Sequence, residues 1–98
     1  MSVKILVICA NQDILKVIGR VINSNENWAA TGKSTIPEAI DALFADHFDL
    51  LLIGSGFTDE EEQSLSQYVQ NTFPEVRITR HFGGGSGLLA AEIYQTLS

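Results

Sequence analysis

The single cysteine of the chain, Cys9, is the residue best suited to nucleophilic chemistry. It follows an apolar run over residues 3–8 and precedes a segment that can begin a helix at Asn11 or Asp13. A thiolate beside a helix N-terminus is stabilised by the helix dipole and is a reactive nucleophile. However, residues 10–14 (ANQDI) lack the glycine, serine and threonine residues of a phosphate-cradling loop, and Asp13 would repel phosphate. Lone cysteines at strand ends are usually small buried hydrophobic residues, which is the interpretation we favour.

A second candidate site lies where two predicted strands end. In an open α/β sheet the ligand crevice forms beyond the carboxyl ends of the strands, where the strand order reverses. The residues expected to line it are Cys9, Ala10, Asn11, Gly54, Ser55 and Gly56. Backbone N–H groups there, aided by a helix N-terminus, can hold a phosphate or another small anion. The alternative is that Gly54 and Gly56 only permit a tight turn, because no acid or base accompanies them.

Other segments carry charge or glycine without a defined chemical motif. The glycine run 83–87 (GGGSG) has neither the lysine nor the spacing of a Walker loop. It suits an adaptable connection, or a hinge by which the last helix exchanges between protomers. Arg80 and His81 could receive an anion, although positive charge on an edge strand commonly prevents aggregation. The acidic run 59–62 is expected to complement a helix N-terminus, with metal binding as a distant second interpretation, and His47 is expected to face solvent or to be favoured by a helix dipole. We predict no metal site and no cofactor.

The composition is that of one acidic globular domain. With 98 residues, of which 45% are hydrophobic, the chain can bury its own core, so residues 1–98 are expected to form a single domain. The net charge of −6 argues against nucleic acid and anionic membrane surfaces as partners. The N-terminal apolar run is too short to span a membrane and lacks a signal-peptide layout. A cytoplasmic location is expected.

Strands alternate with helices four times along the chain. Two strands, over residues 3–8 and 50–53, are uniformly apolar, as in the centre of a parallel sheet. Two others, over residues 28–31 and 76–82, are more polar and belong at the edges. Right-handed crossovers then predict an α/β fold, a flavodoxin-like three-layer sandwich with a four-stranded parallel sheet of order 2-1-3-4.

Each predicted helix has a start signal and an apolar stripe. Helices are expected from residue 11 or 13 to 22, from 35 to near 48, from 58 to 73 and from 88 to 97. The pairs Thr35/Glu38 and Thr58/Glu61 have the spacing of a capping box. The predicted inward-facing residues of the first three helices are Ile14, Val17, Ile18, Val21 and Ile22, then Ala39, Ile40, Leu43 and Phe44, then Leu65, Tyr68, Val69 and Phe73.

Three segments, 4–8 (KILVI), 38–43 (EAIDAL) and 48–53 (FDLLLI), resemble the receiver domains of bacterial two-component response regulators. Receivers bind Mg²⁺ through an acidic pair after the first strand, where this chain has Cys9 and Ala10, which offer no oxygen ligand. They accept phosphate on an aspartate after the third strand, where this chain has Gly54. The family's switch hydroxyl falls on Phe82 or near Thr79, and its lysine after a fifth strand has no counterpart. The resemblance therefore implies a receiver that is degenerate and shortened at its C-terminus.

We predict a non-enzymatic, phosphorylation-independent signalling module that acts through protein contacts. A homodimer is expected, joined by the last strand and the last helix through Val76, Ile78, Arg80, Phe82, Ile93 and Tyr94. One alternative is a cysteine phosphocarrier, because Cys9 is similar in position to the phosphorylated cysteine of sugar-phosphotransferase B domains. The other is a small-anion sensor that uses the crevice around Asn11, Ser55 and Gly56.

Overall fold

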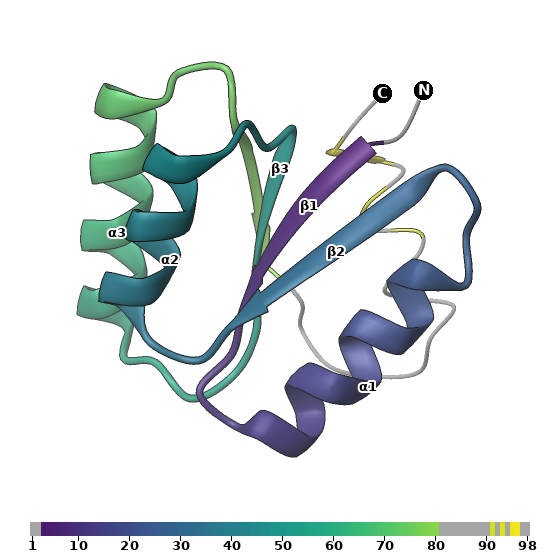
Figure 1. Ribbon diagram of the computed structural model, residues 1–98. Coiled ribbons are helices and arrows are strands. Elements are labelled where there is room, and N and C mark those ends of the chain that lie inside the picture. The colour runs from purple at the N-terminus through teal and green to yellow at the C-terminus, as the bar shows by residue number, and fades with distance from the viewer. Residues whose placement is uncertain (1–2, 81–90, 92, 94, 97–98) are drawn as a thin grey trace.

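The computed structural model describes residues 3–80, 91, 93, 95 and 96. Its strands are β1 (Val3–Ile8), β2 (Trp28–Lys33), β3 (Leu50–Ile53) and β4 (Arg77–Arg80), and its helices are α1 (Gln12–Asn23), α2 (Ile36–Ala45) and α3 (Asp59–Thr72). The strands form one parallel sheet of order β2-β1-β3-β4, which confirms the predicted topology. Helices α2 and α3 cover one face of this sheet and α1 covers the other (Figure 1).

Burial of the strands follows their place in the sheet. Residues 5–8 of β1 and all of β3 are buried, because both strands lie between two others and are covered on both faces. The edge strands β2 and β4 are only partly buried, as their polar residues indicated. Strand β2 continues to Lys33, further than predicted, because Gly32 and Lys33 stay in register with Val7 and Ile8.

The helices begin at the predicted capping residues. The Asn11 side chain accepts hydrogen bonds from the backbone N–H groups of Asp13 and Ile14, at 3.0 and 3.1 Å. Thr58 and Glu61 form a reciprocal capping box. Helix α2 ends at Ala45 rather than near Phe48, because the backbone of Asp46 is extended (φ −148°). This early end frees Phe48 to be buried in the core.

Several helical residues predicted to face inward are exposed instead. Phe44 is 64% exposed, Val17 56%, Ile14 41% and Tyr68 39%. Only a narrow arc of each helix is buried against the sheet. On each helix the buried residues are two that lie four positions apart: Ile18 and Ile22 on α1, Ala39 and Leu43 on α2, and Leu65 and Val69 on α3. Apolar residues on the flanks of these helices therefore remain at the surface.

The final segment completes the core on the α1 face. Residues 91, 93, 95 and 96 are helical, and Ile93 is completely buried against a cluster that includes Ile18 and Trp28. The Arg77 guanidinium also donates a 2.8 Å hydrogen bond to the carbonyl oxygen of Thr96. The predictions made for Phe82, Tyr94 and the glycine run 83–87 lie outside the described residues. Within the described part of the chain, no helix is both long and apolar enough to cross a bilayer.

Candidate functional site

The residues predicted to line the crevice do meet at the carboxyl edge of the sheet. Register between β1 and β3 pairs Ile8 with Ile53, which places Cys9 beside Gly54. The Gly54 N–H donates to the Ile8 carbonyl oxygen at 2.7 Å, and the Ala10 N–H donates to that of Ser55 at 3.0 Å. The two loops are therefore bound directly to each other.

Cys9 is enclosed by this contact. Its side chain is completely buried, and its thiol donates a 3.4 Å hydrogen bond to the carbonyl oxygen of Asn11. The Ser55 hydroxyl lies 3.7 Å from the sulfur. A nucleophilic thiolate needs solvent access and a positive environment, whereas this thiol faces a carbonyl oxygen inside the protein. The geometry is that of a small structural residue.

Both glycines of the second loop lie where the first loop approaches closely. A Cβ atom on Gly54 would lie 3.0 Å from the Cβ and 3.1 Å from the Sγ of Cys9, closer than ordinary van der Waals contact. Gly56 has φ +100°, and a Cβ atom there would overlap the Cβ of Ala10. The glycines thus permit both a tight turn and contact between the loops.

Five backbone donors of this edge have partners within the protein. The Cys9 N–H donates to the Lys33 carbonyl oxygen at 3.0 Å, and the Ala10 and Gly54 N–H groups are bonded between the loops. At the N-terminus of α1, the Asn11 side chain takes the N–H groups of Asp13 and Ile14. An anion bound to these five N–H groups would have to displace internal hydrogen bonds. Among the described residues, no group of three histidine, cysteine or acidic residues could hold a metal ion.

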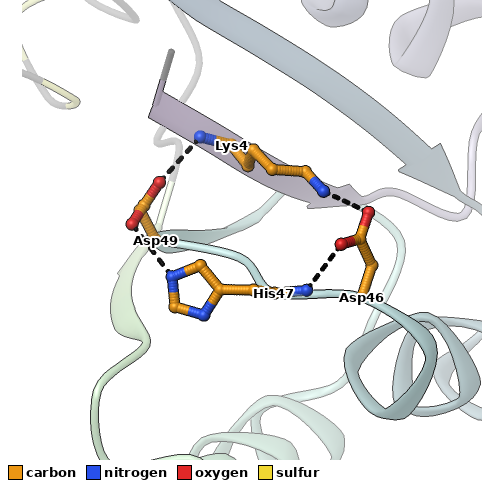
Figure 2. Close-up of polar contacts among 4 residues, drawn as sticks. All are labelled: Lys4, Asp46, His47 and Asp49. Carbon is orange, nitrogen blue, oxygen red and sulfur yellow. Dashed lines mark hydrogen bonds and ion pairs between the residues drawn. The ribbon is translucent and has the colours of Figure 1, made fainter. Parts of the chain in front are cut away.

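A polar cluster that the sequence analysis missed lies at the opposite, amino-terminal edge (Figure 2). The backbone N–H of Lys4 donates to the Asp49 carboxylate at 2.9 Å, and the Lys4 ammonium forms an ion pair with Asp46. His47 donates its backbone N–H to Asp46 at 2.8 Å, and its ring nitrogen Nε2 lies 3.3 Å from Asp49. The sequence feature that could have indicated this cluster is a lysine within an apolar strand, together with two aspartates just before another strand.

This cluster joins the beginnings of β1 and β3. The hydrogen bond from the Lys4 ammonium, followed by that from the His47 N–H, lowers the pKa of the Asp46 carboxyl. The Asp49 N–H also donates to the Lys4 carbonyl oxygen at 2.8 Å, so backbone and side chains hold the same junction. His47 is exposed, as expected. These contacts hold the beginnings of β1 and β3 together, and we call the four residues Lys4, Asp46, His47 and Asp49 the edge clamp.

The predicted dimer residues divide into buried and accessible ones. Val76 is 8% exposed and Ile93 is completely buried, so neither is free to contact a partner in this fold. The sequence predicts Val76 and Ile93 as surface residues, because the spacing of apolar residues in a strand or helix does not show which face another element covers. Ile93 would enter an interface only if the final helix were exchanged between protomers. Ile78 is half-buried, and exposed Arg80 forms a 3.2 Å ion pair with Glu62.

Comparison with solved structures identifies the fold. A response regulator from Thermotoga maritima superposes with a TM-score of 0.74 at 13% identity, over 98% of this chain and 80% of that one. The non-phosphorylated receiver domain of the stress response regulator RcsB from Escherichia coli gives a TM-score of 0.72 at 13% identity, over 98% and 76%. A putative pilus assembly-related protein from Burkholderia pseudomallei gives 0.66 at 19% identity, over 96% and 72%.

These likenesses show a receiver-like fold, as the sequence resemblance implied. No protein-family profile and no curated protein matches the chain. At such low identity the shared architecture leaves the function to be argued from the residues at the site.

Proposed function

We propose that this chain is a degenerate receiver-like signalling module that acts through protein contacts and does not depend on phosphorylation. The observation that carries the proposal is that Gly54, where the resemblance to receivers puts their phosphoacceptor aspartate, lies against the buried Cys9. A glycine has no oxygen to phosphorylate. The neighbouring positions, Cys9 and Ala10, offer no ligand suited to Mg²⁺.

Phosphotransfer from a small donor tests this proposal directly. The chain is incubated with acetyl phosphate and Mg²⁺, and its intact mass is measured. We expect no phosphoryl adduct, while a receiver that retains its acceptor aspartate, treated in parallel, gains one. An adduct on this chain under the same conditions would overturn the proposal.

The two alternatives are less well supported by the same geometry. A phosphocarrier needs an accessible thiolate, whereas Cys9 is completely buried and donates to the Asn11 carbonyl oxygen. An anion sensor needs available donors, whereas the N–H groups of Cys9, Ala10 and Gly54 are bonded internally. Non-enzymatic action through the protein surface is therefore the function we favour.

We further propose that residues 1–98 fold as one domain and that two copies join along β4. The other edge of the sheet, at β2, is partly blocked, because the Asn23 side chain accepts the Ala30 N–H at 3.0 Å. On β4, Ile78 supplies apolar surface. Sedimentation velocity should show self-association that Ile78→Lys weakens. A wild-type chain that stays monomeric at high concentration would exclude this interface.

A further inference from the structure

An apolar groove with an acidic end runs between α2 and α3. It has a volume of about 510 Å³ and is lined by Ile36, Ile40, Glu60, Glu61, Ser64, Leu65 and Tyr68. Phe44 continues the four-residue spacing of Ile36 and Ile40 along α2, and this residue is 64% exposed although its ring contacts that of Phe73. Among the described residues that line the groove there are two carboxylates and no cation. A complementary partner is therefore an amphipathic helix that carries positive charge.

Helix α1 of this same chain has that chemistry. Ile14 and Val17 are 41% and 56% exposed, and with half-buried Val21 they lie within an arc of about 60° around the helix. The exposed cations Lys16 and Arg20 begin about 60° further round on the same flank, where exposed Asp13 also lies. The flank of α1 thus carries an apolar strip bordered by two cations and one carboxylate, a net positive charge.

The two surfaces also match in length and charge. The seven steps along the helix from Ile14 to Val21 span about 10 Å of helix axis, and the eight steps from Ile36 to Phe44 span about 12 Å. Two cations on α1 can meet the two carboxylates at the groove. Although the chain carries a net charge of −6, this pairing brings opposite charges together.

We propose that α1 of one copy docks into the α2–α3 groove of a second copy. Because α1 and the groove lie on opposite faces of the sheet (Figure 1), each copy can use both surfaces at once. The contact is head-to-tail, so assembly continues into a ring or an open chain instead of ending at a two-fold dimer. The proposal rests on the proposed action through protein contacts, but it does not involve the β4 edge.

Charge reversal on each side, followed by mixing, tests the proposal. The K16E/R20E variant makes α1 acidic, and the E60K/S64K variant makes the groove basic while leaving the Glu61 cap intact. Each variant alone sets like charges against each other, and we expect its self-association to be about tenfold weaker or more. In an equimolar mixture both junctions become complementary, and association should return.

Sedimentation velocity over roughly two decades of concentration provides the measurement. We expect wild-type species larger than a dimer that grow with concentration. The E26K variant reverses an exposed charge away from both surfaces and should behave as wild type. Circular dichroism confirms that each variant is folded. A wild type that never exceeds a dimer, or a mixture that fails to restore association, would overturn the proposal whatever the acetyl phosphate result.

Discussion

Replacing Gly56 by alanine should destabilise the fold through two separable effects. The backbone there has φ +100°, which costs an L-residue about 1–2 kcal/mol. The new methyl group also overlaps the Ala10 side chain, and overpacking of this kind costs about 1–3 kcal/mol. Alanine also lowers the conformational entropy of the unfolded chain, which stabilises the folded state by about 0.4–1 kcal/mol. The net loss is about 1–5 kcal/mol, with a central value of about 3 kcal/mol.

Urea denaturation resolves a change of this size. With a slope of about 1.5 kcal/mol per molar, a loss of 3 kcal/mol lowers the midpoint by about 2 M. The double variant Ala10→Gly/Gly56→Ala removes the overlap but retains the unfavourable backbone, so it should recover only the packing part, about 1–3 kcal/mol.

Gly19 provides a matched control. It lies within α1, and nothing would touch a Cβ atom built on it. Gly19→Ala should therefore stabilise the chain by about 0.5–1 kcal/mol through helix propensity. If Gly56→Ala unfolds at the wild-type midpoint, or if Ala10→Gly recovers nothing in the double variant, the contact between the loops is not what excludes a side chain at Gly56.

Three further predictions concern the core, the cysteine and the edge clamp. Leu43→Ala should cost about 2–5 kcal/mol in chemical denaturation, whereas its exposed neighbour Phe44→Ala should cost far less; equal losses would contradict the observed helix orientation. The Cys9 thiol should react with iodoacetamide only at the rate of global unfolding, as followed by mass spectrometry, and fast labelling of the native chain would show that it is accessible. The lowered pKa of Asp46 adds stability that is complete above the unfolded-state pKa of about 3.9 and is lost as the pH falls through the folded-state value. Unfolding of Asp46→Asn at a series of pH values should therefore show a shallower acid loss than wild type, and identical profiles would mean that the pairing with Lys4 adds nothing.

The order of the sheet could be predicted from hydrophobic pattern alone. Two uniformly apolar runs had to be central and two mixed runs had to be at the edges, and parallel crossovers left one simple arrangement. The caps at Asn11, Thr35 and Thr58 were also visible, because a capping side chain bonds within three residues of itself. Helix capping and strand burial both depend on short stretches of sequence, so both could be predicted.

Features that depend on distant neighbours could not be predicted in this way. Helical periodicity placed Phe44 and Val17 on the apolar side of their helices. How much of that side is buried depends on how each helix packs against the sheet. The contacts of Lys4 with Asp46 and Asp49 join residues more than forty positions apart, as the separations of 42 and 45 show. The sequence predicted that the loops after β1 and β3 lie side by side, and they do. Which backbone N–H groups of these loops are hydrogen-bonded to each other depends on how closely the loops approach.

The contact between Cys9 and Gly54 has a consequence for introducing carboxylates at these two positions. An aspartate at position 54 would need the space that the cysteine side chain fills, and an acidic residue at position 9 would be buried without its metal. Either substitution made first gives a chain less stable than the present one, so the two positions must change together. Packing therefore couples the two positions, so that neither accepts a carboxylate by itself without a loss of stability.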